Sequence, residues 1–197
     1  TIYSRLMNPQ ALVFEERVAA LEGGAAALAT ATGSAAITYA VQNIATAGDS
    51  YCIFCTCLWW NIQPVCQYFK RAGNLRNLVD PSDPENFRKA IQPNTKLLYG
   101  ETLGNPNSDV LDLEAVSAVA HENGIPLIVD STFATPFLLR PLEHGADIVV
   151  HSATKFMGGH GSVMGGVIVD GGKFDWTQND KFPGITKPNP SYHGVVF

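Results

Sequence analysis

The fold is decided by two stretches, IPLIVDST at residues 125–132 and ADIVVHSATKFMGGHG at residues 146–161. Each contains a short apolar run rich in β-branched residues, which is typical of a buried strand. Polar residues follow each run at once: Asp130 after the first, and the segment ending in Lys155 after the second. Ligands of open α/β sheets bind at the carboxyl ends of strands. We therefore expect Asp130 and Lys155 at one edge of a sheet.

Strand and helix signals alternate through the rest of the chain. Apolar residues recur at helical spacing before Gly23-Gly24 and again after Thr32, which predicts two helices. The predicted elements that follow are strand 51–57, helix 60–71, strand 75–79, helix 84–91, strand 96–100, helix 112–123, and strands 125–129, 147–151 and 163–169. This order predicts an α/β fold, with βαβ units and a mostly parallel sheet sandwiched by helices.

Composition excludes several classes of protein. The chain has 197 residues, of which 46% are hydrophobic, so we expect one large domain, or one domain plus a fragment, rather than a disordered chain. The net charge of -5 and the absence of basic clusters argue against nucleic acid and anionic membranes as partners. No apolar run reaches the ~18–20 residues of a membrane span, and no secretory signal is visible. We expect a cytoplasmic protein.

Four cysteines lie close together, Cys52, Cys55, Cys57 and Cys66. Such spacing raises the possibility of a metal or redox site. On a strand at 51–57, however, Cys55 and Cys57 would share one face and Cys52 would point to the other, so a single tetrahedral site requires a bend. We favour buried free thiols and expect no metal.

Several residues near the predicted sheet edge fit the functional groups of pyridoxal phosphate. Gly33 opens a helix whose backbone N–H groups could bind phosphate, although Thr32-Gly33 is equally a plain helix cap. Ser152 and Thr154 could donate hydroxyl hydrogen bonds to that phosphate. Lys155 could bond the carbonyl carbon, and a buried Asp130 could keep the pyridine nitrogen protonated. Separately, Lys155 could be a solvated lysine and Asp130 a turn residue; together they indicate this cofactor.

The chain resembles the Cys/Met-metabolism, cystathionine γ-synthase-like family of pyridoxal-phosphate (PLP) enzymes. The resemblance lies in YSRLMNP at 3–9, ERVAALEGG at 16–24, GNP at 104–106, VDST at 129–132 and the run 140–166. The tail from Phe182-Pro183 to SYHG at 191–194 is similar to the O-acetylhomoserine sulfhydrylase branch. The resemblance implies the large domain of the fold-type-I PLP transferases, with a mostly parallel, seven-stranded-type sheet.

The resemblance also implies roles for particular residues. Lys155 would be the catalytic Schiff-base lysine and Asp130 the partner of the pyridinium nitrogen. The remaining cofactor contacts would come from the N–H groups of Gly33 and Ser34, the hydroxyls of Ser152 and Thr154, and Asn105 near the ring hydroxyl or the substrate carboxylate, with Glu101 nearby. Tyr3 and Arg5 would reach the phosphate of a neighbouring subunit. The active sites would then be shared between subunits of a homodimer or homotetramer.

The implied reaction is γ-replacement on O-acetyl-L-homoserine by sulfide or a thiol, giving homocysteine or methionine and acetate. The alternatives are a γ-elimination enzyme such as methionine γ-lyase, a cystathionine γ-synthase, or a non-catalytic homologue impaired in cofactor binding. Relatives carry Tyr-Gly-Gly-Thr where this chain has Leu58-Trp59-Trp60-Asn61, which favours the last alternative.

The chain is expected to have three parts. Residues 1–30 would form an N-terminal segment and helix contacting the neighbouring subunit, and residues 31–172 the PLP-binding large domain. Residues 173–197 would be a loop leading to an absent C-terminal domain; from its composition alone, this tail could also be an active-site loop.

Overall fold

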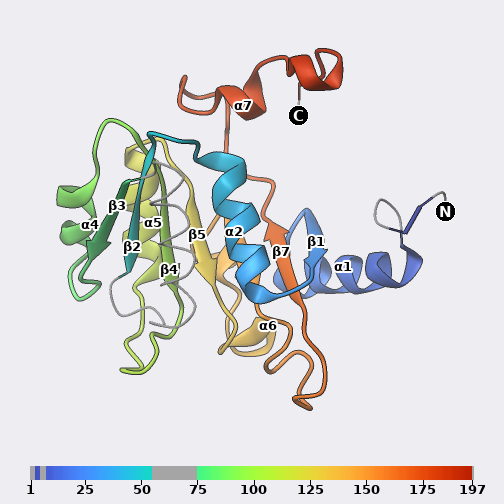
Figure 1. The fold of residues 1–197 in the computed structure, drawn as a ribbon. Helices are drawn as coiled ribbons and strands as arrows, with labels where there is room; N and C mark the ends of the chain where they lie inside the picture. The colour runs from blue at the N-terminus through green and yellow to red at the C-terminus, as the bar shows by residue number, and fades with distance from the viewer. Residues whose placement is uncertain (1–2, 5–7, 55–74, 197) are drawn as a thin grey trace.

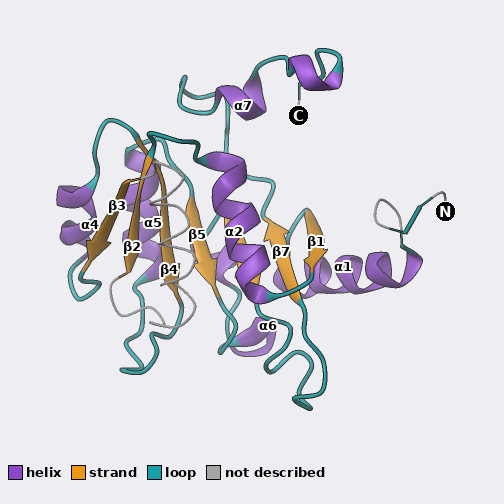
Figure 2. Cartoon of the chain, viewed as in Figure 1, coloured by secondary structure: helices purple, strands orange, loops and turns teal. Residues whose placement is uncertain are grey.

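The computed structural model describes residues 3–4, 8–54 and 75–196, which form one seven-stranded sheet with helices on both faces (Figures 1 and 2). The strand order is β1-β7-β6-β5-β4-β2-β3. Helix α2 covers one face of this sheet, and α4 and α5 cover the other (Figure 1). The predicted α/β class is confirmed.

The strands are parallel except at one position. Their bounds are β1 Ala26–Thr30, β2 Ser50–Phe54, β3 Leu75–Val79, β4 Thr95–Glu101, β5 Leu127–Asp130, β6 Ile148–His151 and β7 Gly166–Asp170. Strand β7 lies between β6 and β1 and is antiparallel to both. Strand β1 was not predicted, and it joins the sheet as an edge strand. The predicted helix 60–71 and the end of the predicted strand 51–57 lie outside the described residues.

The four longest helices of the described residues begin at residues whose side chains cap them. The helices are α1 Pro9–Glu22, α2 Gly33–Ile44, α4 Pro84–Ala90, α5 Leu113–Glu122, α6 Thr135–Leu138 and α7 Pro183–Thr186, with short 3₁₀ turns at Pro141–His144 and Pro190–Tyr192. Gly23 ends α1 in the left-handed conformation, at φ 73°. The Thr32 hydroxyl accepts a hydrogen bond from the Ala35 N–H at 3.0 Å, which caps the start of α2.

The core lies between the central strands and the helices that cover them. Every residue of β5 and β6 is buried, as expected for central strands of a parallel sheet. Helix α2 buries Ala36, Ile37 and Val41 against this sheet. Because the central strands are fixed on both faces, the residues at their carboxyl ends are held on a rigid frame.

The segment after β7 packs at the end of the sheet opposite to the carboxyl ends of β5 and β6 (Figure 1). Phe182 is 2% exposed and makes edge-to-face contacts with Phe174 and Trp176 at centroid distances of 5.8 and 5.1 Å. The Lys181 ammonium donates to the Asn123 carbonyl at 2.9 Å, just before β5 begins. Within this chain, the tail therefore lies away from the carboxyl ends of β5 and β6.

Cys52 is buried in β2 as a free thiol, as expected. Burial raises the pKa of this thiol to about 11, against a hydrogen bond with Asn77 that lowers it. Cys55, Cys57 and Cys66 lie outside the described residues. No helix in the described part of the chain is long and apolar enough to cross a membrane.

Candidate active site

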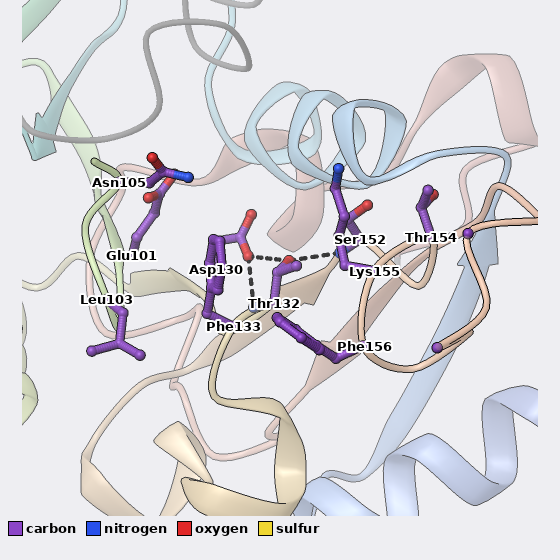
Figure 3. A pocket seen from close by; sticks show the side chains of 12 residues that line it. Glu101, Leu103, Asn105, Asp130, Thr132, Phe133, Ser152, Thr154, Lys155 and Phe156 are labelled. Carbon is purple, nitrogen blue, oxygen red and sulfur yellow. Dashed lines mark hydrogen bonds between the residues drawn. The ribbon is translucent and has the colours of Figure 1, made fainter. Parts of the chain in front are cut away.

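A cavity of about 480 Å³ opens at the carboxyl ends of β4, β5 and β6 (Figure 3). The side chains and glycines around it come from these strand ends and from the loops that follow them. They are Glu101, Leu103, Asn105, Asp130, Thr132, Phe133, Ser152, Thr154, Lys155, Phe156, Gly159 and Gly161. Asp130 and Lys155 thus line the same cavity, as the two strand endings predicted.

Asp130 ends β5 and presents a buried carboxylate to the cavity. One of its oxygens accepts hydrogen bonds from the Thr132 hydroxyl at 2.5 Å and the Thr132 N–H at 2.9 Å. The other oxygen faces the cavity (Figure 3). Burial raises the pKa of Asp130, while the two bonds from Thr132 and the positive charge of His151 oppose this rise. A cationic group placed in the cavity would stabilise the ionised carboxylate.

Glu101 ends the neighbouring strand β4 and lies directly beside Asp130 in the sheet register. It is 5% exposed and lines the cavity together with Asn105. Figure 3 shows Glu101 and Asn105 on one side of the cavity and Lys155 and Ser152 on the other, with Asp130 and Thr132 between them. The cavity therefore combines two carboxylates, a carboxamide, hydroxyls and one amine.

Ser152 lines the cavity and lies against the start of α2. A side chain at Gly33 would place its Cβ atom 2.6 Å from the Ser152 Cβ and 2.8 Å from the Ser152 Cα, so only glycine fits there. The N–H groups of Gly33 and Ser34 open the helix and have no intrahelical acceptor. They lie where the positive end of the helix dipole favours an anion, as the sequence predicted.

Thr154 is held in a different way from Ser152. Its hydroxyl donates to the Gly165 carbonyl at 3.2 Å and accepts from the Gly165 N–H at 3.1 Å. The single hydroxyl proton is therefore directed at the backbone of the segment before β7 rather than at a ligand. Thr154 lines the cavity, but it must turn its hydroxyl before it can donate to a phosphate.

Lys155 is exposed to the cavity on the turn that follows β6. Its N–H donates to the Ser152 carbonyl at 3.1 Å, and its own carbonyl accepts from the Gly159 N–H at 2.8 Å. These bonds fix the backbone from Ser152 to Gly159 while leaving the side chain in the open space. The amine can therefore reach a bound carbonyl carbon.

Among the described residues, three predicted cofactor residues are not part of the cavity lining: Tyr3, Gly33 and Ser34. Tyr3 is 52% exposed and precedes the start of α1 in the chain. Ser34 is exposed on the first turn of α2. Arg5 lies outside the described residues, as do Leu58, Trp59, Trp60 and Asn61.

Sequence reasoning assigned no role to Thr132 or to the aromatic residues at the cavity. The Thr132 hydroxyl donates to Asp130 and accepts from the Ser152 N–H at 2.8 Å, so it ties the carboxylate to the segment that carries Lys155. The Asp-x-Thr spacing is a signal that could have identified it. Phe133 and Phe156 contact each other at a centroid distance of 5.7 Å and form an apolar wall.

The residues present fit pyridoxal phosphate. The start of α2 at Gly33, packed closely against Ser152, suits a phosphate, and the carboxylate of Asp130 suits a protonated ring nitrogen. Lys155 suits the aldehyde carbon. The apolar wall of Phe133 and Phe156 would exclude water from part of the cavity.

Comparisons with known proteins agree with this fit. The model of the family "Cys/Met metabolism PLP-dependent enzyme" matches residues 1–191. The chain is 54% identical to O-acetyl-L-homoserine sulfhydrylase of Leptospira meyeri and 49% identical to homocysteine synthase of Schizosaccharomyces pombe, in each case over 100% of its length.

Among solved structures, a Campylobacter jejuni protein containing N'-pyridoxyl-lysine-5'-monophosphate superposes with a TM-score of 0.95. It is 36% identical and covers 99% of this chain. The chain spans about half the length of these relatives, 44%, 46% and 48% respectively. With nearly every residue inside the family match and the cofactor's functional groups met in one cavity, the chain belongs to the Cys/Met metabolism family of PLP-dependent enzymes.

Proposed function

We propose that this protein catalyses γ-replacement on O-acetyl-L-homoserine, in which sulfide or a thiol replaces acetate and homocysteine or methionine is formed. The observation that carries the proposal is the single cavity shared by Asp130, Ser152 and Lys155, with the N-terminus of α2 against it. Identity of 54% and 49% with a sulfhydrylase and a homocysteine synthase supports the substrate class.

The cofactor would be held at three points of the cavity. The N–H groups of Gly33 and Ser34 and the hydroxyl of Ser152 would bind its phosphate, and Asp130 its ring nitrogen. When bound, pyridoxal phosphate supplies an electron sink that stabilises negative charge at the substrate Cα. Asn105 would orient the ring hydroxyl or the substrate carboxylate from the opposite side.

Lys155 would first hold the cofactor and then move protons. Displaced by the substrate amino group, its free amine would take the proton from the substrate Cα. It would then assist removal of a Cβ proton, so that acetate leaves from Cγ and the sulfur nucleophile can add there. The backbone bonds of Lys155 with Ser152 and Gly159 hold the base of its side chain at one side of the cavity.

We propose a homodimer or homotetramer in which Tyr3 and Arg5 reach the phosphate of the neighbouring subunit. The tyrosine is not among the residues that line its own cavity, and a guanidinium matches phosphate oxygens well. Exposed apolar side chains support an assembly: Leu12 and Val13 on α1, and Phe137, which is 91% exposed, and Leu138 on α6. Helices α1 and α6 also contact each other within the chain.

We also propose a cytoplasmic location. The support is the buried, free thiol of Cys52, which is typical of a compartment that keeps thiols reduced. Fractionation of cells expressing the protein, with an antibody against it, would test this location directly.

Two measurements test the activity. Lys155→Ala should abolish the visible absorption band of lysine-bound cofactor, whereas Lys89→Ala, at an exposed position on α4, should keep it. Retention of the band in Lys155→Ala would remove this lysine from the role. In the second measurement, the purified protein is incubated with O-acetyl-L-homoserine, with and without sulfide.

Product analysis then separates replacement from its alternatives. Homocysteine and acetate formed only with sulfide support γ-replacement. Release of 2-oxobutanoate and ammonia without a nucleophile would indicate γ-elimination, and cystathionine formed with cysteine would indicate a cystathionine γ-synthase. A protein that gives neither a visible band nor a product would be the non-catalytic homologue.

A further inference from the structure

A second, smaller cavity adjoins the candidate active site. Its volume is about 270 Å³, and it is lined by Leu103, Gly104, Asn105, Pro106, Ser108 and Phe133. Leu103, Asn105 and Phe133 also line the main cavity, so the two spaces lie side by side. Two further cavities, of about 290 and 300 Å³, share no lining residue with the main one. We refer to the adjoining space as the side chamber.

The side chamber differs from the main cavity in charge. Its lining combines the apolar side chains of Leu103, Pro106 and Phe133 with one carboxamide and one hydroxyl, and no charged side chain of the described residues belongs to it. The main cavity contains two carboxylates and an amine. Figure 3 shows the Leu103 side chain pointing away from Glu101 and Asn105. Because burial of an unpaired charge is costly, the side chamber favours a neutral, apolar group.

The loop that carries Leu103 is fixed by its own backbone. Leu103 pairs with Val110 in a short antiparallel bridge. Between them, the Gly104 N–H donates to the Asp109 carbonyl and the Ser108 N–H donates to the Gly104 carbonyl, each at 2.8 Å. This wall of the side chamber is therefore preformed, and the size of the side chain at position 103 limits the space.

The proposed reaction brings a second substrate to the main cavity. With a thiol, a C–S bond replaces the C–O bond at Cγ of O-acetyl-L-homoserine, and the thiol proton is released with the acetate. The amino-acid substrate is charged and suits the polar groups of the main cavity, whereas the alkyl group of a thiol is neutral. Since Leu103, Asn105 and Phe133 line both spaces, a thiol whose alkyl group lies in the side chamber has its sulfur next to the main cavity.

We propose that the side chamber binds the alkyl group of a thiol nucleophile, and that Leu103 determines how long this group can be. The inference rests on the proposed function, because it assumes that γ-replacement occurs in the main cavity. It names uncharged alkyl thiols as the favoured nucleophiles. Thiols that carry charged groups, such as cysteine, are disfavoured in the same space.

A series of nucleophiles of increasing length tests the proposal. Sulfide has no alkyl group and serves as the internal reference. Relative to sulfide, kcat/KM should rise from methanethiol to ethanethiol and propanethiol by about fourfold for each methylene group that is buried. Compared at equal thiolate concentration, cysteine should react roughly tenfold or more slowly than ethanethiol, because its charges would have to enter an apolar space.

Substitutions of Leu103 change the size of the side chamber in opposite directions. Leu103→Phe should lower kcat/KM for propanethiol about tenfold relative to that for sulfide, because the ring fills the space. Leu103→Ala should move the best substrate toward longer thiols such as pentanethiol. Val110→Ala is the matched control, since Val110 pairs with Leu103 but is 73% exposed and lines neither cavity. It should keep the wild-type order of thiols.

Binding of the alkyl group can also be followed without turnover. In the absence of O-acetyl-L-homoserine, propanethiol should shift the methyl signals of Leu103 in carbon-13 NMR, which are assigned by their loss in Leu103→Ala. Sulfide should not shift them. The methyl signals of Val110, on the same loop but exposed, should not respond to either nucleophile.

A wild-type series in which kcat/KM does not depend on chain length would overturn the proposal, as would Leu103 methyl signals that propanethiol leaves unshifted. An equal loss for sulfide and propanethiol in Leu103→Phe would do the same. If that variant does not fold, the wild-type series and the NMR titration still decide. A protein that forms no homocysteine with sulfide would overturn the proposed function instead. The NMR titration needs no turnover, so the two failures are distinguishable.

Discussion

Gly33→Ala tests whether the close approach of α2 to Ser152 builds the phosphate site. The added Cβ would lie 2.6 Å from the Ser152 Cβ, whereas ordinary contacts begin at 3.4 Å, so helix and strand end must separate by about 0.8 Å. The Gly33 position and the Ser152 Cβ are both fixed by the backbone, so neither can move away by rotation of a side chain. Overpacking of this kind costs about 1–3 kcal/mol of folding free energy.

The same displacement moves the N–H groups of Gly33 and Ser34 away from the cavity. A hydrogen bond to a charged group contributes about 1.5–3 kcal/mol, so losing one should weaken binding of pyridoxal phosphate by roughly ten- to a hundredfold. Binding is measured by titrating the cofactor and following the visible band. The free energy of unfolding is measured in urea without cofactor.

Gly184→Ala is the matched control. Gly184 is also helical, in α7, and a Cβ there meets nothing within 4 Å. This variant should bind cofactor like the wild type and be equally stable or slightly more stable, because alanine favours the helix. If Gly33→Ala behaved in the same way, the close approach of α2 to Ser152 would have no part in binding phosphate.

Three further predictions follow from burial and charge. Asp130→Asn should weaken binding of pyridoxal phosphate and should stabilise the cofactor-free protein. Burial raises the pKa of Asp130, so the wild type loses the stability that the neutral carboxyl contributes as pH rises through the folded pKa. The difference in unfolding free energy between variant and wild type, measured in urea, should therefore shrink toward low pH. The neutral thiol of Cys52 contributes stability below pH 9 that is lost as pH rises through about 11. The unfolding free energy of the wild type should therefore fall by about 3 kcal/mol relative to Cys52→Ala over this range. Parallel curves of unfolding free energy against pH for the two proteins would show that this thiol does not titrate. Phe182→Ala should cost about 3–5 kcal/mol of unfolding free energy, because the ring is 2% exposed among Phe174 and Trp176, and should leave cofactor affinity unchanged; a loss of affinity would contradict the placement of this segment away from the cavity.

The parallel part of the fold could be predicted because its strands are rich in Val, Ile and Leu and are separated by helices with regular apolar spacing. Strand β1 could not, because Ala26–Thr30 is mostly alanine, which has low strand propensity, and it is a strand because it pairs with β7. The predicted strand 163–169 begins instead at Gly166, since Gly165 is bonded to the Thr154 hydroxyl. Contacts with residues outside the segment itself decided both cases.

The cavity itself was predicted from two strand endings, because side chains that follow parallel strands emerge at one edge. Asp130 and Lys155 therefore needed no structure to be brought together. The contact between Glu22 and His151 did, because the two residues are 129 positions apart and neither stands in a pattern that predicts a partner. The bond of Thr154 to Gly165 likewise depends on how the loop returns to the sheet.

The reversed direction of β7 has a consequence for the loop that carries Lys155. Because β6 and β7 are antiparallel neighbours, this loop is a hairpin connection whose two ends are hydrogen-bonded to each other through the sheet. A parallel arrangement would have sent the chain through a long crossover instead. Insertions or deletions at the tip of the hairpin, around Gly161, could therefore change what surrounds the amine without altering the strand pairing that sets its starting point.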